Sequence, residues 1–338
     1  MWTEDKLNEM LTTPSAALIE DIKKIDGDIM ILGAGGKMGP TLSLLCKNAV
    51  KAAGIDKKVI AVSRFTDEIA TKLLTDNGVD IIKCDLQDTA QLNALPDVKN
   101  VIYMAGRKFG TYGNEWQTWG MNSTIPAHVC EKFKGASIVV FSSGNIYPLV
   151  PNHSGGCKET TRVEPIGEYA TSCLARERSF EYAAHTFGTK IFMYRLNFAV
   201  DLRYGVLYDI AEKIMSGTPI SVTTPVFNII WQGSANEIAI RGLLHASEDV
   251  EIMNVTGPEI LSVKAVAEEL GALLGKEPIY CGEESGVSYI ANAGKMLDTF
   301  GYPEVTASTL IKWQAQWIKD GGRALGKPTH FEERGGKY

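Results

Sequence analysis

Short apolar segments alternate with helix-length segments from about residue 28 to residue 200, and this alternation limits the possible folds more than any other feature. The strand-like segments are residues 29–32, 59–62, 79–82, 98–103, 137–141 and 190–196. The helix-length segments between them include residues 38–53, 67–77, 115–133 and 167–187. Strand and helix in regular alternation predict a Rossmann-type α/β fold, a doubly wound parallel sheet with helices on both faces.

The rest of the chain flanks this unit on both sides. Residues 1–27 predict a helical extension, interrupted near Pro14 because proline breaks a helix. Beyond the unit at 28–200, residues 201–338 predict a smaller α/β lobe that returns to the main sheet at a strand over 251–255. Its last helix, near 308–318, carries Trp313 and Trp317 at a spacing typical of a packing stripe.

Composition excludes several classes of function. The 338 residues carry 34 Lys and Arg against 40 Asp and Glu, a net charge of −6, which disfavours nucleic acid or an anionic membrane as the main partner. The six cysteines are scattered without a C-x-x-C pair, and the histidines lack ligand spacing, so neither a metal site nor a disulfide framework is expected. The amino-terminal segment has no apolar signal region, so we expect a cytoplasmic protein.

A glycine triplet follows the first strand directly. Gly33, Gly36 and Gly39 have G-x-x-G-x-x-G spacing and precede a helix, with Lys37 and Met38 inside the loop. Such a loop permits a tight turn and a close approach of the backbone to a phosphate group, which the helix N-terminus then faces. A glycine triplet alone is a weak signal, but between a first strand and a helix it predicts a dinucleotide cofactor.

The ends of the next strands refine the cofactor prediction. The second strand ends at Ser63 and Arg64, where an NAD site usually places a carboxylate for the ribose. A guanidinium there suits a 2′-phosphate, with Lys37 as another possible cation, so NADP is preferred over NAD. Further cofactor contacts are expected at the ends of the third and fourth strands, from Asp85, Leu86, Ala105, Gly106 and Lys108.

Later motifs occur in a characteristic order. They are Asn122, the segment FSSGNIYP at 141–148, GEYATSC at 167–173, RLN at 195–197 and NVTGPE at 254–259. With the glycine loop, they resemble the extended short-chain dehydrogenase/reductase superfamily, specifically the NAD-dependent epimerase/dehydratase family, over about residues 28–320. The resemblance implies a homodimer formed through the helices at 115–133 and 167–187.

The resemblance also implies roles for individual residues. Tyr169 matches the acid/base that exchanges a proton with the substrate, Ser143 matches its hydroxyl partner, and Asn122 matches an orienting residue. The family mostly acts on sugars, often linked to nucleotides. Residues expected to contact such a substrate are Ser143, Asn145, Arg195, Asn197 and Trp231, with Arg203 and Tyr204 as further candidates.

One position departs from the family pattern. Cys173 replaces the lysine that normally follows the tyrosine by four residues, and a thiol cannot supply the positive field that makes tyrosinate accessible near neutral pH. Another cation could take over, with Lys108 and Arg107 nearest in the family layout, and Arg176 or Arg178 on the tyrosine helix. Alternatively, Cys173 itself acts as an acid/base group, or the protein binds its cofactor as a sensor.

The function expected from the sequence is therefore an NAD(P)-dependent oxidoreductase or epimerase that acts on a sugar or a sugar-derived acid. The alternative is a non-catalytic NAD(P)-binding regulatory or interaction protein, because the missing lysine weakens tyrosine activation.

Overall fold

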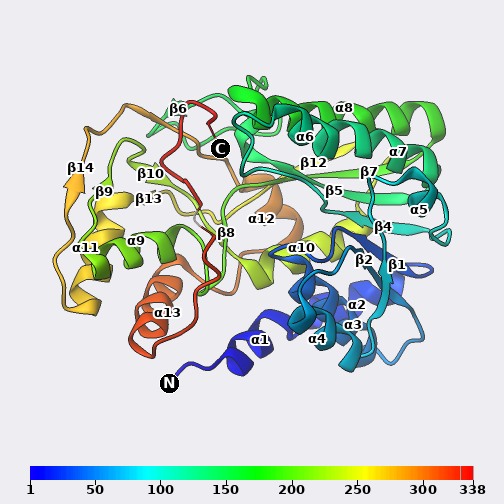
Figure 1. Cartoon of the computed structure of the whole chain (residues 1–338), viewed down its shortest axis with the longest axis horizontal. Helices are drawn as coiled ribbons and strands as arrows, with labels where there is room; N and C mark the ends of the chain where they lie inside the picture. Colours follow the sequence, from blue (N-terminus) through cyan, green and yellow to red (C-terminus); the bar gives the residue numbers. More distant parts are fainter. Residues whose placement is uncertain (328, 338) are drawn as a thin grey trace.

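The computed structural model describes residues 1–327 and 329–337. A parallel sheet of seven strands forms its centre, in the order β12-β7-β5-β4-β1-β2-β3 (Figure 1). The strands are β1 (Ile29–Leu32), β2 (Val59–Ser63), β3 (Asp80–Lys83), β4 (Asn100–Tyr103), β5 (Ser137–Ser143), β7 (Lys190–Leu196) and β12 (Glu251–Val255). The strand order reverses between β1 and β4, and ligands of such sheets bind in the crevice outside the strand ends at this point.

Helices cover both faces of the sheet, as the alternation predicted. One face carries α2 (Ala16–Lys24), α3 (Gly39–Ala52), α4 (Glu68–Asp76), α10 (Gln232–Arg241) and α12 (Gly294–Phe300). The other carries α5 (Thr89–Asn93), α6 (Glu115–Trp119), α7 (Ile125–Lys132) and α8 (Gly167–Phe187). The fold class is thus the predicted one.

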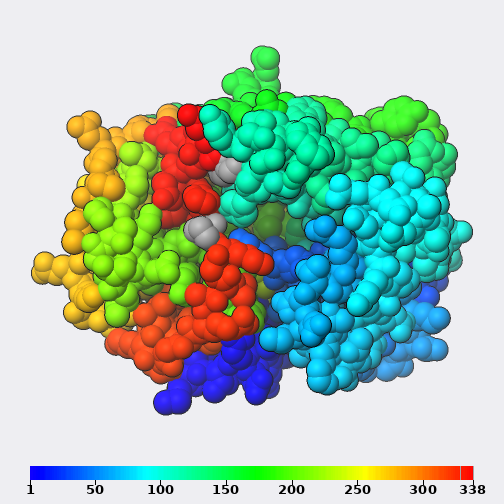
Figure 2. Space-filling view, in the orientation of Figure 1, coloured from blue at the N-terminus to red at the C-terminus, as the bar shows by residue number. Residues whose placement is uncertain are grey.

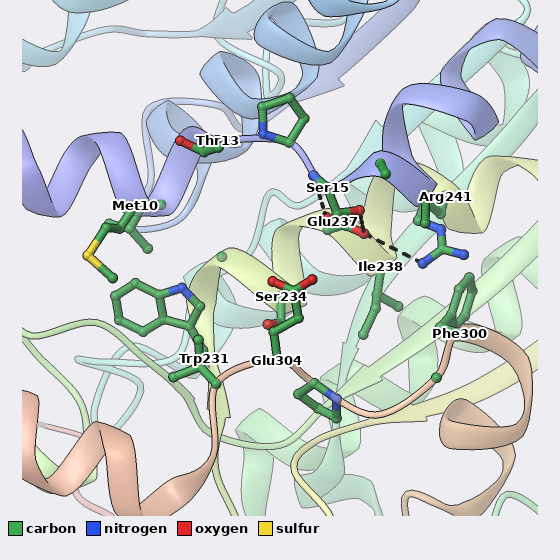
Figure 3. Close-up of a pocket in the computed structure, with 18 of the residues that line it drawn as sticks. Met10, Thr13, Ser15, Trp231, Ser234, Glu237, Ile238, Arg241, Phe300 and Glu304 are labelled. Carbon is green, nitrogen blue, oxygen red and sulfur yellow. Dashed lines mark hydrogen bonds and ion pairs between the residues drawn. The ribbon is translucent and has the colours of Figure 1, made fainter.

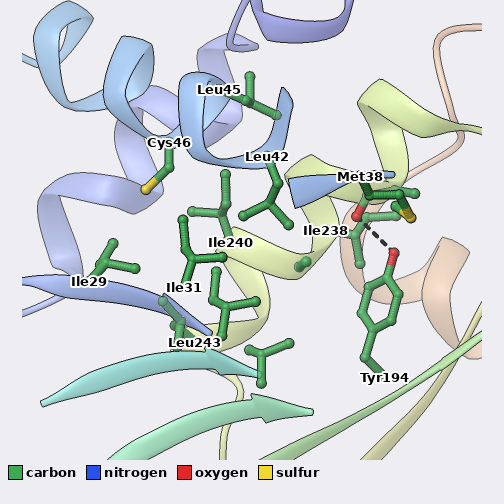
Figure 4. Close-up of a cluster of buried hydrophobic side chains, with 14 of the residues drawn as sticks. Ile29, Ile31, Met38, Leu42, Leu45, Cys46, Tyr194, Ile238, Ile240 and Leu243 are labelled. Carbon is green, nitrogen blue, oxygen red and sulfur yellow. Dashed lines mark hydrogen bonds between the residues drawn. The ribbon is translucent and has the colours of Figure 1, made fainter. Parts of the chain in front are cut away.

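Successive side chains of β1 point to opposite faces of the sheet, as in any pleated strand, and pack in the core on each face. Ile29 and Ile31 lie in the cluster under α3, where Figure 4 shows Ile29 on the side of Cys46 and Ile31 on the side of Leu42. Met30 and Leu32 belong to the cluster on the opposite face. Full burial of each such side chain stabilises the fold by roughly 1.5–3 kcal/mol, which explains why β1 reads as an unbroken apolar run.

The amino-terminal segment forms two helices, α1 (Glu4–Thr12) and α2, with the break at the predicted place near Pro14. The side chain of Ser15 caps α2 by accepting a hydrogen bond from the backbone N–H of Leu18. Its hydroxyl also donates to Glu237 of α10 at 2.6 Å. This contact ties the extension to the body of the protein.

A smaller lobe follows β7. Its helices are α9 (Val206–Ser216), α11 (Val263–Leu274) and α13 (Ala307–Lys319). The short strands outside the main sheet are β6 (Val150–Pro151), β8 (Ala199–Val200), β9 (Ile220–Ser221), β10 (Val226–Phe227), β11 (Ile230–Trp231), β13 (Leu261–Ser262), β14 (Tyr280–Cys281) and β15 (Val287–Ser288). Trp313 and Trp317 belong to the core of this lobe, so their predicted packing role is confirmed.

The predicted helix over 115–133 is interrupted. Between α6 and α7 the chain forms a π-helical turn, Gly120–Thr124. Asn122 lies in this turn and is fully buried. A π-turn inside a helix often marks a functional site, because the wider turn redirects one side chain.

After α13 the chain turns back across the molecule, where Figure 1 shows it in red. The backbone N–H of Leu325 donates to the carbonyl oxygen of Arg203 at 3.0 Å. Thr329 donates to the carboxylate of Asp209 in α9 from its backbone and its hydroxyl. Gly336 packs so closely against Gly167 that a Cβ on either glycine would overlap the backbone of the other segment. The carboxyl-terminal segment thus runs from the small lobe to the start of α8.

Candidate functional site

The loop between β1 and α3 has the shape that a dinucleotide requires. Gly33 has φ +89°, and a Cβ on it would lie 2.6 Å from the backbone nitrogen of Ala105. A Cβ on Gly39 would overlap the carbonyl oxygen of Ala34. Both positions therefore need glycine for the fold itself. Gly36 differs, because a Cβ there would meet only the carbonyl oxygen of Gly33, at 3.5 Å, and the space above it is otherwise open to a ligand.

The start of α3 offers the donors that a pyrophosphate needs. The helix begins after Met38 without a side-chain cap, and a proline occupies its first turn. The first N–H groups of a helix lack partners within it and carry partial positive charge, so they bind anions. The glycine cradle and the uncapped helix together fit a dinucleotide cofactor.

The strand ends beside this loop show the predicted cofactor residues. A Cβ on Gly35 would lie 2.6 Å from the hydroxyl oxygen of Ser63. Arg64 is exposed at the end of β2, and no hydrogen bond or ion pair engages it within residues 1–327 and 329–337. Asp85 accepts a hydrogen bond from the backbone N–H of Gln87 at 3.0 Å.

Two further predicted cofactor residues have other settings. Leu86 is buried in the core between the sheet and α7 and α8. Gly106 faces Arg176, because a Cβ there would lie 2.5 Å from the guanidinium. No cluster of metal-ligating side chains is present in the described part of the chain, and none of its helices is long and apolar enough to cross a membrane.

Tyr169, Ser143 and Cys173 meet where β5 ends and α8 begins. The side chains of Ser143 and Cys173 lie near the phenol of Tyr169 and act on its pKa. Burial raises the pKa of Tyr169 well above its ordinary value; a charged Cys173 would raise it further, while Ser143 and the charge of Arg176 lower it. The structure thus brings together the three residues that the sequence motifs grouped. The phenol keeps its proton at neutral pH in the cofactor-free protein.

Cys173 is fully buried. Burial raises the pKa of its thiol, and the charge of Arg176 and the nearby phenol of Tyr169 only partly offset this effect. The thiol is therefore neutral at physiological pH. This arrangement disfavours the interpretation that Cys173 itself serves as the acid/base group.

A cation does reach Tyr169 from another element. The ammonium of Lys108, in the loop after β4, lies 5.5 Å from the centre of the Tyr169 ring and 5.6 Å from that of Phe109. Burial lowers the pKa of Lys108 to about 8; Cys173 opposes this effect and the nearby charge of Lys37 adds to it. Lys108 is one of the four candidate cations that the sequence named, and it was also expected among the cofactor contacts.

Asn122 holds the Lys108 loop against the tyrosine helix. Its Oδ1 accepts from the backbone N–H of Arg107 at 2.9 Å, and its Nδ2 donates to the Arg107 carbonyl oxygen at 2.8 Å. The same amide accepts from Arg176 at 2.6 Å and donates to Ser172 at 3.0 Å. Asn122 is therefore a positioning residue that fixes the residue before Lys108 relative to α8.

Two of the predicted substrate residues lie next to Ser143. Asn145 accepts a hydrogen bond from the Ser143 hydroxyl at 3.1 Å. The side chain of Asn197 lies beside Gly144, with its Cβ 3.3 Å from the position that a Cβ on that glycine would take. These amides can donate and accept hydrogen bonds with a polyol at the end of β5.

Arg195 has partners within a buried network. It is 4% exposed and forms an ion pair with Glu177 at 2.7 Å. Its guanidinium also donates to the Tyr147 hydroxyl at 2.7 Å. Each guanidinium nitrogen of Arg195 already donates to a described residue. The side chain therefore stabilises the core beneath the site rather than binding a substrate diphosphate.

Trp231 lies in a different region from Tyr169. Its ring packs against Trp313 with the ring centres 5.7 Å apart, inside the small lobe. Figure 3 shows it lining a cavity of about 630 Å³ between the amino-terminal helices and α10, where Glu237 contacts Ser15 and Arg241. The structure therefore favours a packing role for Trp231, which the sequence could not distinguish from substrate contact.

The sequence did not predict that the carboxyl-terminal segment borders the site. Figure 2 shows a hollow bordered by the orange-red carboxyl-terminal segment and by the blue and teal parts of the nucleotide-binding half. His330 of this segment lies against Phe109, with ring centres 5.6 Å apart. No local motif predicts this contact, because His330 and Phe109 are far apart in the chain.

The sequence model of the NAD dependent epimerase/dehydratase family matches residues 29–223. The chain belongs to this family. The match covers every strand of the main sheet except β12 and includes Tyr169, Ser143 and Cys173. A search of curated proteins found no significant match to the chain.

Solved structures similar to this family member share its fold. Pal from Bacillus thuringiensis has a TM-score of 0.72 at 14% identity, covering 87% of this chain and 99% of that chain. UDP-glucose 4-epimerase of Thermus thermophilus, in complex with NAD, has a TM-score of 0.69 at 17% identity, covering 86% and 99%. UDP-glucuronic acid 4-epimerase from Bacillus cereus, also with NAD, has a TM-score of 0.69 at 16% identity, covering 87% and 99%.

Proposed function

We propose that this protein is an NAD(P)-dependent epimerase or oxidoreductase that acts on a sugar or a sugar-derived substrate, with Tyr169 as the acid/base. The observation that carries the proposal is the phenol of Tyr169 near Ser143 at the end of β5, on the same edge of the parallel sheet as the open glycine loop after β1. Family membership and the names of the similar structures, which include UDP-sugar epimerases with NAD, support a sugar substrate.

The chemistry divides between the cofactor and this chain. When bound, the nicotinamide accepts or returns a hydride. The chain's own residues move the matching proton: Tyr169 as the phenolate takes it from a substrate hydroxyl, or as the phenol gives it to a carbonyl, and Ser143 hydrogen-bonds the same substrate oxygen. Asn122 keeps these elements in register through its four side-chain hydrogen bonds.

Lys108 supplies the positive charge that the family lysine would provide. A cation beside the phenol favours the phenolate form in the crevice and so lowers the cost of removing the proton. Arg176 adds a second, deeper charge, held by the carbonyl oxygen of Phe141 at 2.7 Å. Both cations come from positions other than that of Cys173. The site therefore has the positive charge of the family lysine, but other residues carry it.

The cofactor is NADP in preference to NAD. The supporting observation is Arg64, exposed at the end of β2, where a family NAD site would place a carboxylate. Arg64→Ala is expected to weaken NADP binding by about tenfold and to leave NAD binding within about threefold, measured by calorimetry. Equal losses for both dinucleotides would contradict the preference.

The protein acts as a homodimer in the cytoplasm. The supporting observation is a groove of about 400 Å³ between α7 and α8, which exposed Tyr182 lines and which lies on the helices expected to form the dimer. Tyr182→Glu is expected to convert the dimer to a monomer in sedimentation experiments. A wild-type monomer at micromolar concentration would refute the assembly.

The test of function compares Tyr169→Phe with the wild type. Purified protein is expected to bind NAD(P), and a screen of sugars and sugar nucleotides is expected to reveal turnover by product analysis and by reduced-nicotinamide absorbance. Tyr169→Phe should abolish turnover but keep cofactor affinity, since the phenyl ring preserves the packing. Unchanged turnover would refute the assignment. Binding of cofactor without turnover of any tested compound would favour the non-catalytic alternative.

A further inference from the structure

The side chain of Lys37 leaves the glycine loop in an unexpected direction. Its ammonium lies 4.8 Å from the centre of the Tyr204 ring and 5.0 Å from that of Phe109. It donates a hydrogen bond to the carbonyl oxygen of Lys327 at 3.3 Å. These partners belong to the small lobe, the loop after β4 and the carboxyl-terminal segment, so the Lys37 side chain points toward the small lobe.

The rings that surround Lys37 are held in place. The Tyr204 hydroxyl donates to Gln232, whose amide donates to Thr41 of α3 at 3.0 Å. Phe109 contacts Lys37, Lys108 and His330, each within 6 Å of its ring centre. Aromatic faces attract cations, so this arrangement keeps several ammonium groups in one small region.

The region carries excess positive charge. Burial lowers the pKa of Lys37 to about 8, and the charge of Lys327 lowers it further, while Asp209 opposes both. The carboxylate of Asp209 already accepts two hydrogen bonds from Thr329. Among the described ion pairs, none includes Lys37. Half-buried ammonium groups that repel each other favour an anion that would join them.

The same region adjoins the proposed acid/base. Lys108 contacts both Phe109 and Tyr169, so only one side chain separates the Lys37 region from the reacting phenol. Contacts of 5.0 to 5.6 Å link the Lys37 ammonium to the Tyr169 ring through Phe109 and Lys108, so a substrate that spans these contacts would meet Tyr169 with a hydroxyl and Lys37 with an anionic group. The carboxyl-terminal segment would border that group on the side of the small lobe.

We propose that Lys37, supported by Phe109 and Tyr204, binds an anionic group of the substrate, a carboxylate or a phosphate on the reacting sugar. The inference rests on the proposed function and narrows its substrate class to acidic or phosphorylated sugars. It also reassigns Lys37, which the sequence placed among the cofactor contacts. The pyrophosphate of the dinucleotide is the other possible source of the same charge, and the experiment separates the two.

The experiment measures binding to the full-length protein by calorimetry, first with NAD(P) alone and then with sugars added to the NAD(P)-saturated protein. The probes are matched sets of neutral hexoses, their uronates and their phosphates, such as glucose, glucuronate and glucose 6-phosphate. The variants are Lys37→Met, which removes the charge, and Lys37→Arg, which keeps it. Lys72→Met is the control, because this lysine is 75% exposed in an ion pair on α4.

At least one anionic sugar is expected to bind about tenfold more tightly than its neutral counterpart, a difference of about 1.4 kcal/mol. Lys37→Met should remove this preference and change dinucleotide affinity less than about threefold, while Lys37→Arg and Lys72→Met retain it. Equal affinity for anionic and neutral sugars, or no binding of any probe, would overturn the inference. So would a loss of dinucleotide affinity in Lys37→Met that accounts for the whole effect. A wild-type protein that binds no dinucleotide would instead refute the proposed function.

Discussion

Replacing Lys108 by methionine tests how this site activates its tyrosine. The ammonium lies 5.5 Å from the centre of the Tyr169 ring. For unit charges at that separation, Coulomb's law with an effective dielectric constant of about 20 gives an interaction of about 3 kcal/mol. This corresponds to about 2 pKa units in the phenol. Lys108→Met removes the charge and keeps a similar side-chain length, so turnover near neutral pH should fall between about 10- and 100-fold.

The pH dependence makes the prediction specific. The pKa of Lys108 is lowered to about 8, so its charge is present below that pH and is lost above it. The ratio of wild-type to Lys108→Met turnover should therefore be largest below about pH 7 and should approach one above about pH 9. The assay is the pH profile of kcat/KM for both proteins, with circular dichroism to establish that the variant folds.

Two further variants separate charge from packing. Lys108→Arg retains the charge and should retain most of the activity. Adding Cys173→Lys to Lys108→Met returns a cation to the usual family position and should recover at least part of the loss. If Lys108→Met lowers turnover equally at every pH, or leaves it unchanged, Lys108 does not act through its charge and the explanation is wrong.

Three other variants test separate parts of the structure. Gly36→Ala should keep the melting temperature but weaken dinucleotide binding at least about tenfold, whereas Gly33→Ala, at φ +89°, should lower the melting temperature itself; equal stability losses would contradict the distinction. Glu177→Gln leaves the buried Arg195 guanidinium without its counter-charge and should cost about 3–5 kcal/mol in denaturant unfolding, and a loss below about 1 kcal/mol would show that the pair is dispensable. Asn122→Leu breaks the contacts to Arg107 and Arg176 and should lower kcat more than cofactor affinity, whereas an unaltered kcat would refute its positioning role.

The sequence predicted the elements whose information is local. The apolar run of β1 and the glycine spacing after it place the loop, and the helical period places Tyr169, Cys173 and Arg176 near one another on α8. Arg178, on the same helix, is instead 57% exposed and pairs with Glu181. Periodicity and turn chemistry suffice for these features because each depends on neighbouring residues.

Other features depend on contacts between distant segments and could not be predicted. The π-turn at Asn122 continues a helical pattern without interruption, so its wider geometry leaves no trace in the periodicity. Arg195 and Glu177 pair only because β7 and α8 pack together. The direction of Lys37 depends on Tyr204 and Lys327, which lie far along the chain. Local sequence patterns therefore do not predict the direction of the Lys37 side chain.

A structure of the NAD(P) complex would test the central claim most directly. We expect the pyrophosphate to lie over Gly36 and the nicotinamide ring to lie beside the Tyr169 phenol. The Lys108 ammonium should remain next to the Tyr169 ring. A dinucleotide bound elsewhere, or a phenol turned away from the nicotinamide with Lys108 directed into solvent, would contradict the claim.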